Sequence, residues 1–258
     1  MRSLGEIAFV LRGFATLESV SAEYLSNARE LSRRRRTAAI QFARDMEGLL
    51  DELAMARTRF EVRFNDGELP ESEWSERGID NAEFFVSPNP GEELRPLARI
   101  VSGGELSRVM LALKTLANTK PGTMFDSNPS APKTLIFDEV DAGIGGRVAD
   151  VVGSRLGDLG NRFQVLCITH LPQIAARGGA QFLIEKSIRG SRTVTRVERL
   201  DQEGRIAEVA RMIGGATITE QTRASARELL QARSGACRDE ARSAESGERR
   251  KAKAKVRG

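Results

Sequence analysis

The segment Val101-Ser102-Gly103-Gly104-Glu105-Leu106-Ser107-Arg108 predicts a glycine-rich turn that leads into a helix. Ser102 can cap the start of this helix, and Glu105 has the spacing of a capping box. Free N–H groups at the helix start and two glycines without side chains favour binding of a phosphate. Because an ordinary turn and helix start has the same pattern, this segment alone leaves the function open. Apolar residues at helical spacing predict one face packed on a core, namely Leu106, Val109, Met110, Leu113, Leu116 and Ala117.

A second segment, Thr134-Leu135-Ile136-Phe137-Asp138-Glu139, predicts a short strand buried on both faces, as in parallel sheets. Asp138 and Glu139 follow at its carboxyl end, and they cannot do the same job because successive strand residues point to opposite sides. Ligands of open α/β sheets bind beyond the carboxyl ends of strands, so one carboxylate could hold a metal ion and the other could face an attacking water. A strand that simply enters a solvated acidic loop is the competing interpretation.

A third segment, Phe163 to Ile168, predicts another buried strand, and Thr169 and His170 follow it. His170 is the single histidine of the chain. A lone histidine is commonly structural, but one at the carboxyl end of a strand, after an acid-bearing strand, is well placed to sense a phosphate. A predicted helix from Arg147 to Leu159 would join the two strands as a βαβ crossover, so the sequence predicts an α/β fold.

These segments resemble the C-terminal half of ABC-type ATPase heads, and more closely the SMC-like RecN family of DNA repair proteins. The resemblance runs from about Leu49 to about Leu230. Three strings carry it within that group, namely Gly103-Gly104-Glu105-Leu106-Ser107-Arg108, Asp138-Glu139-Val140-Asp141-Ala142-Gly143-Ile144-Gly145-Gly146 and Cys167-Ile168-Thr169-His170-Leu171-Pro172-Gln173.

The resemblance implies an ABC-type head half, a P-loop-NTPase-like sheet with flanking helices, preceded by a coiled-coil arm. It implies that Asp138 supports Mg²⁺, that Glu139 polarises the attacking water and that His170 contacts the γ-phosphate of ATP. It also implies that Asp141 is the acid of the D-loop. The implied signature motif, which would face ATP held by the second head of a homodimer, comprises Ser102, Gly103, Gly104 and Glu105.

No Gly-x-x-x-x-Gly-Lys-[Ser/Thr] sequence occurs in the 258 residues. We therefore expect the loop that cradles the α- and β-phosphates to come from an N-terminal half that carries Walker A. In one interpretation the chain is the ATPase half of a RecN-type double-strand-break repair protein that acts on DNA in the cytoplasm, at the nucleoid. In the other it hydrolyses nothing by itself and serves as a dimerisation or DNA-binding module. A transporter ATPase is disfavoured by the helical arm and by the absence of a membrane partner feature.

The two ends of the chain have different compositions from the middle. We expect residues 1–58 to be a truncated coiled-coil arm, residues 59–232 the C-terminal lobe of the head, and residues 233–258 a disordered basic tail. Arg33 to Arg36 could contact a DNA backbone, although a solvated helix surface is the favoured interpretation. The predicted seam of the arm has alternating three and four spacing over Ala39, Phe42, Met46, Leu49, Leu53, Ala56 and Phe60.

The net charge of +4 is unevenly distributed. From Arg233 to Gly258 there are nine Lys and Arg against four Asp and Glu, a net of +5, which leaves −1 for the rest. Cys167 lies in a predicted buried strand and Cys237 in the tail, so we expect no disulfide and a reducing environment. No apolar run is long enough to predict a membrane span, and the first apolar run does not have the features of a signal peptide.

Overall fold

The computed structural model describes residues 4–100, 102–119, 134–189, 192–215 and 217–232. The chain divides into two compact units, Met1–Val101 and Ser102–Gly258. The predicted α/β fold with a preceding helical arm is confirmed. The predicted tail, residues 233–258, lies outside the described residues. The prolines and glycine of residues 118–133 predict a surface loop, and nearly all of that range also lies outside the described residues.

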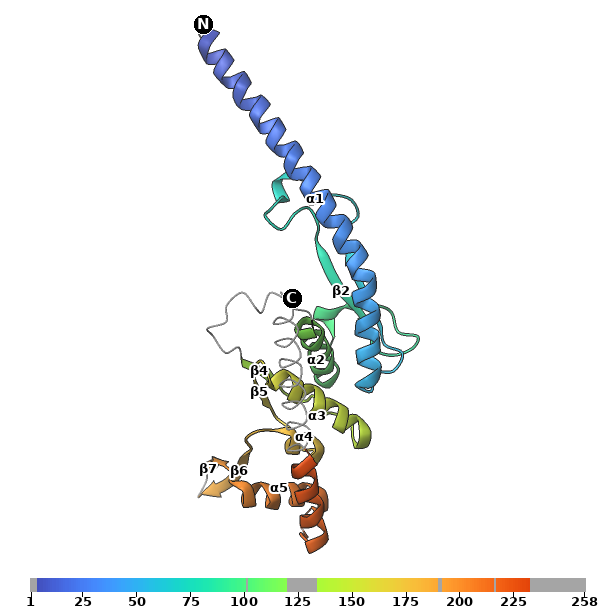
Figure 1. Ribbon diagram of the computed structural model, residues 1–258, viewed down its shortest axis with the longest axis vertical. Helices are drawn as coiled ribbons and strands as arrows, with labels where there is room; N and C mark the ends of the chain where they lie inside the picture. Colours follow the sequence, from blue (N-terminus) through green and yellow to red (C-terminus); the bar gives the residue numbers. More distant parts are fainter. Residues whose placement is uncertain (1–3, 101, 120–133, 190–191, 216, 233–258) are drawn as a thin grey trace, which may run out of the picture. The chain divides into compact units, whose positions relative to one another are not determined.

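The first unit is built on α1 (Leu4–Glu52), one continuous helix of 49 residues (Figure 1). Met46 and Leu53 of the predicted seam are fully buried, at 0% and 1% exposure. The seam is wrong at two positions: Leu50 is buried in place of the half-buried Leu49, and Ala56 lies beyond the helix in solvent. The helix ends earlier than the seam predicts, so the last seam positions fall on a turn and a strand.

A small antiparallel sheet packs on the last turns of α1. It comprises β1 (Arg59–Phe64), β2 (Ala82–Ser87) and β3 (Arg95–Pro96), in the order β1-β2-β3. Three aromatic rings connect the helix to the sheet, because Phe42 lies 5.9 Å from Phe60 and 5.8 Å from Phe84, measured between ring centroids. A short 3₁₀ turn, η2 (Leu97–Arg99), follows β3.

The connection between β1 and β2, residues 65–81, is packed along α1, and we call it the arm-docking segment (Figure 1). Its polar sequence predicts a loop or irregular segment, and it contains one 3₁₀ turn, η1 (Glu71–Glu73), and is otherwise irregular. The Trp74 ring stacks on Tyr24 of α1, with centroids 5.1 Å apart. Ser32 Oγ of α1 donates to Asp80, whose side chain is only 3% exposed. The middle of α1, from Tyr24 to Arg36, therefore contacts the arm-docking segment.

The four successive arginines of α1 are largely engaged by acidic groups of the same chain. Arg33 and Arg34 both contact Glu30, at 2.9 and 2.7 Å. Arg35 and Arg36 face Asp80, at 3.5 and 3.7 Å. These contacts favour a structural role for the cluster, and a DNA contact stays a prediction.

The second unit contains a parallel pair of strands, β4 (Thr134–Phe137) and β5 (Gln164–Cys167), with Thr134 opposite Gln164. The helix α3 (Gly146–Gly160) connects them, as the βαβ prediction required. Its buried face comprises Ala149, Val152, Gly153, Leu156 and Leu159.

One face of this parallel pair is left in solvent by the described residues. Ile136 is 70% exposed and Leu166 is 46% exposed, whereas Phe137, which points to the opposite face, is 4% exposed. The prediction that these strands are buried on both faces is therefore wrong for the described part of the chain. Side chains alternate across a strand, so covering only one face leaves every second apolar residue in water.

The buried stripe of α2 (Gly103–Thr119) matches the predicted one only in part, at Val109. Val109, Leu111 and Ala112 are fully buried. Met110 and Leu113, which the prediction placed in the core, are only half-buried. The buried stripe also includes Gly104 and Arg108, near the start of the helix. Both residues contact the turn after β4.

The rest of the second unit consists of helices and one hairpin. The hairpin pairs β6 (Phe182–Arg189) with β7 (Arg192–Arg199). The helices are α4 (Pro172–Arg177), α5 (Gln202–Gly214) and residues 220–232. The last two pack through a small core of Ile206, Val209, Ala210 and Ala226. No helix among the described residues has the length and apolar character needed to cross a membrane.

Candidate functional site

The start of α2 meets the turn that follows β4. Ser107 Oγ donates to the backbone oxygen of Asp138 at 2.6 Å. Asp138 and Glu139 are both exposed, and Asp138 Oδ1 accepts a hydrogen bond from the backbone N–H of Glu139 at 2.9 Å. The two acids predicted from the strand pattern therefore stand at the carboxyl end of β4 with free carboxylate oxygens.

Glycine is required where α2 approaches this turn. A Cβ atom at Gly104 would lie 2.9 Å from Ala142 Cβ and 3.2 Å from the backbone oxygen of Glu139. A Cβ atom at Gly103 would meet only the end of the exposed Glu139 side chain, which can move away. Gly104, one of the two glycines predicted to bind phosphate, thus also permits contact between the helix start and the acidic turn.

Ser102 caps α2 as predicted and forms one of the two hydrogen bonds of a capping box. Its Oγ accepts from the backbone N–H of Glu105 at 3.5 Å, and its carbonyl accepts from Leu106 at 3.0 Å. Ser102 and Gly103 are exposed, whereas Glu105 is half-buried. The positive end of the helix is therefore open to an anion.

Asp141 lies behind the same turn and holds the end of β5. Its side chain is 5% exposed, and Oδ2 accepts from Thr169 Oγ1 at 2.6 Å and from the backbone N–H of His170 at 2.9 Å. The third partner of Oδ2 is His170 Nδ1, at 3.0 Å. The His170 ring itself is 72% exposed. The structure thus brings Asp141 and His170 together as one unit.

Two further residues of the site had no role in the sequence analysis. Arg108, 8% exposed, donates from Nη1 to the carbonyl of Ala142 at 2.9 Å. Desolvation by burial lowers the pKa of Arg108, and the nearby Glu105 carboxylate partly opposes this shift. Ser107 contacts Asp138 as described above. The sequence contained one signal for the position of Arg108: it lies four residues after Gly104, so the two share a helix face.

The environment of the site suppresses the reactivity of Cys167. Burial, with smaller contributions from the charges of Asp141 and Asp138, raises the pKa of the thiol to about 12. The thiolate is the nucleophilic form of cysteine, so this thiol is unreactive near neutral pH.

The acids fit a magnesium ion that also binds a substrate phosphate. Magnesium in nucleotide sites is held by one or two carboxylates together with phosphate oxygens and water. Asp138 supplies one such carboxylate, because its side chain is exposed. Among the described residues no group of three or more metal-ligating side chains occurs, so a dedicated all-protein metal site is not found there.

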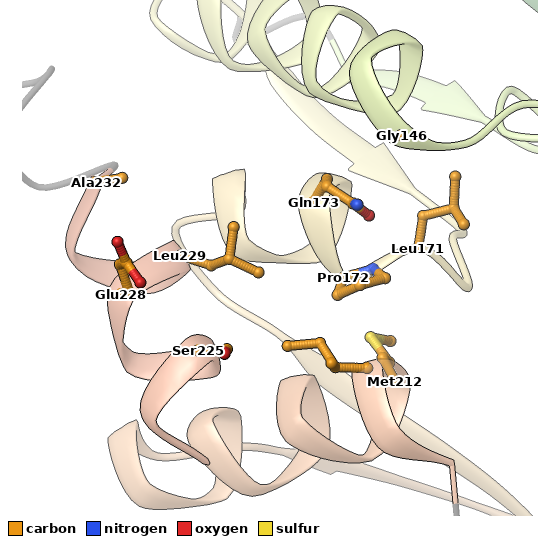
Figure 2. A pocket seen from close by; sticks show the side chains of 10 residues that line it. Gly146, Leu171, Pro172, Gln173, Met212, Ser225, Glu228, Leu229 and Ala232 are labelled. Atoms are coloured by element: carbon orange, nitrogen blue, oxygen red, sulfur yellow. The ribbon is translucent and has the colours of Figure 1, made fainter. Parts of the chain in front are cut away.

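A pocket of about 640 Å³ lies beside the residues that follow His170 (Figure 2). Its walls are largely apolar and come from Leu171, Pro172, Met212 and Leu229, with Gln173 and Glu228 adding polar groups. Neither Asp138 nor Glu139 lines it. The pocket is therefore separate from the acidic turn.

Comparison with known proteins gives consistent sequence matches. No protein-family model matches the chain. The DNA repair protein RecN of Halalkalibacterium halodurans is 39% identical over 215 residues, covering 83% of this chain and 36% of that protein. RecN of Vibrio cholerae is 43% identical over 195 residues, covering 74% of this chain and 33% of that protein. The chain thus spans about a third of the length of these curated relatives.

A solved structure with partial similarity is the Smc head domain with a coiled coil and joint from Pyrococcus yayanosii. It is 20% identical in sequence and has a TM-score of 0.45, covering 79% of this chain and 35% of that chain.

Proposed function

Since the chain belongs to the RecN family, of whose members it spans about a third, we propose that it forms the C-terminal half of an ATP-hydrolysing head that acts in DNA double-strand-break repair. In this proposal the chain contributes three elements to an ATP site formed between two heads. They are the helix start at Ser102–Gly104, the acids Asp138 and Glu139, and His170.

One observation supports this proposal most strongly. The helix start, the acidic turn and the histidine are all linked through residues 138–142, by Ser107 to Asp138, Arg108 to Ala142 and Asp141 to His170. Residues 138–142 therefore hold together three groups that are far apart in the sequence. These groups are of the types that phosphoryl transfer needs.

The proposed chemistry follows from the position of each group. Glu139 orients and polarises the attacking water, and the exposed His170 ring contacts the γ-phosphate. Mg²⁺, when bound beside Asp138, neutralises charge on the phosphate oxygens. The open N-terminus of α2 stabilises the negative charge that develops on the phosphate held by the opposite head.

The face of β4 and β5 that the described residues leave exposed supports the proposal that another half of the head packs on it. Ile136, Leu166 and Ile168 are 70%, 46% and 57% exposed on one side of β4 and β5. Burying a side chain of this size stabilises a protein by about 1.5–3 kcal/mol. In our proposal this face is covered by the half that carries the phosphate-binding loop and its lysine.

A second candidate function is a dimerisation or DNA-binding module without turnover. The lack of a Gly-x-x-x-x-Gly-Lys-[Ser/Thr] loop in the 258 residues favours it for the chain by itself. Both candidate functions include DNA as the partner and the cytoplasm, at the nucleoid, as the place of action.

The role of Glu139 is tested by Glu139→Gln in the complete protein. We expect turnover to fall by about 100-fold or more, since a positioned general base contributes about 10²–10⁴-fold. ATP-bound head dimers should then accumulate, as measured by light scattering after size-exclusion chromatography. Asp150→Asn, at an exposed position of α3, is the matched control and should leave turnover unchanged. Unchanged turnover in Glu139→Gln would show that the assigned role is wrong.

A further inference from the structure

We propose that Asp141 is a positioning residue that fixes the tautomer and direction of His170, so that Nε2 is the ring atom presented to a bound phosphate. The phosphate in this statement rests on the proposed function. The tautomer does not, because it follows from contacts within the chain.

The first step concerns the hydrogen-bonding capacity of Asp141. An ionised carboxylate only accepts hydrogen bonds. Oδ2 lies within 3.0 Å of three partners, two of which, Thr169 Oγ1 and the backbone N–H of His170, donate to it. The third partner, His170 Nδ1, must then carry a hydrogen as well. The neutral ring is therefore the Nδ1–H tautomer.

The second step concerns the freedom of the ring. The His170 side chain is 72% exposed, while the Asp141 side chain is 5% exposed. The Nδ1 contact thus ties an exposed ring to a buried group. Thr169 fixes the backbone beside it, because its Oγ1 donates to Asp141 and accepts from the N–H of Leu171 at 3.0 Å.

The third step concerns the outcome for the site. With Nδ1 bound to Asp141, Nε2 is the ring nitrogen left for an outside ligand. When the ring takes up a second proton from solvent, that proton resides on Nε2 and can be donated to a phosphate oxygen. The carboxylate of Asp141 then balances the charge of the imidazolium ring.

The test uses nitrogen NMR of the whole chain, labelled with ¹⁵N and free of nucleotide, at a pH where imidazole is neutral. His170 is the single histidine, so its two ring nitrogens give unambiguous signals. We expect the Nδ1–H form in the unmodified chain. We expect Asp141→Ala to convert most of the population to Nε2–H, the form that free histidine prefers in water.

Thr169→Val is the matched control, since it removes one hydroxyl partner of the carboxylate and leaves the carboxylate in place. It should keep the Nδ1–H form. The proposal is overturned by an Nε2–H majority in the unmodified chain, by an Nδ1–H majority in folded Asp141→Ala, or by a switch in Thr169→Val as complete as in Asp141→Ala. If circular dichroism shows that Asp141→Ala is unfolded, the unmodified chain still decides the question.

A second readout in the complete protein connects the tautomer to turnover. Asp141→Asn and His170→Ala should each lower ATP turnover, and the double variant should lose no more than His170→Ala alone, because Asp141 acts through His170. Losses that multiply would contradict positioning. The NMR measurement does not depend on ATP hydrolysis. Failure of the proposed function and failure of this inference can therefore be distinguished.

Discussion

Glu139 has a backbone conformation that L-residues rarely adopt, with φ of 56°. Such a conformation costs a non-glycine residue about 1–2 kcal/mol. Strained residues persist where the surrounding structure holds them, and they gather at functional sites. This observation is independent of the sequence pattern, and it supports assigning the water-polarising role to Glu139.

The strain leads to a prediction for a pair of variants. Glu139→Gly relieves the left-handed conformation, whereas Glu139→Ala removes the same carboxylate and keeps the strain. We expect the glycine variant to be more stable to urea unfolding by about 1 kcal/mol, after the greater entropy of glycine in the unfolded chain is included. Equal midpoints for the two variants would contradict strain at this position. Both should lack turnover in the complete protein.

The sequence predicted which residues gather at the site better than it predicted what they contact. Ser102, Glu139 and His170 carried patterns of their own: a cap, a strand end and a lone histidine. The resemblance implied only that Asp141 is the acid of the D-loop, and the structure shows it buried against Thr169 and His170. Such a contact joins residues that are distant in sequence, so no local periodicity reports it.

At the scale of single elements, the arm-docking segment is the feature that the sequence left undefined. Its polar composition predicted a loop, and only its contacts with α1 show that it is held in place. Tyr24 stacks on Trp74 and also donates from its hydroxyl to the carbonyl of Ser75 at 2.9 Å. Aromatic pairs of this kind contribute about 0.5–1.5 kcal/mol beyond their buried area.

Trp74 makes this docking measurable, because it is the single tryptophan of the chain. We expect Tyr24→Ala to shift Trp74 fluorescence emission to longer wavelength and to increase its quenching by acrylamide. Arg29→Ala is the control: it removes an ion pair with Glu68 in which both side chains are exposed, and such pairs contribute little to stability. Identical spectra for Tyr24→Ala and the unmodified chain would show that the stacking does not hold the segment.

The strands and α2 show why periodicity alone mispredicted burial. The sequence placed β4 and β5 correctly, because each is a short apolar run of strand length that ends at polar residues. The prediction of burial failed for Ile136 and Leu166, because an apolar run does not show which faces of a strand the rest of the chain covers. The half-buried Met110 of α2 has the same explanation if a further segment covers it.

At the scale of the whole molecule, we propose that the chain forms an incomplete ATP site. The chain spans about a third of its relatives, carries acids and a histidine on one support, and leaves one face of its parallel strands in water. Each of these features is consistent with a second segment that completes both the core and the phosphate site.

The central claim is tested most directly by measuring ATP binding calorimetrically, with Mg²⁺ present, for the chain alone and after assembly with the N-terminal half of a RecN relative, which we propose supplies the lysine-bearing phosphate loop. Our account predicts no binding by the chain alone, and tight binding with turnover that requires Glu139 after assembly. Tight binding of ATP by the chain alone would contradict it.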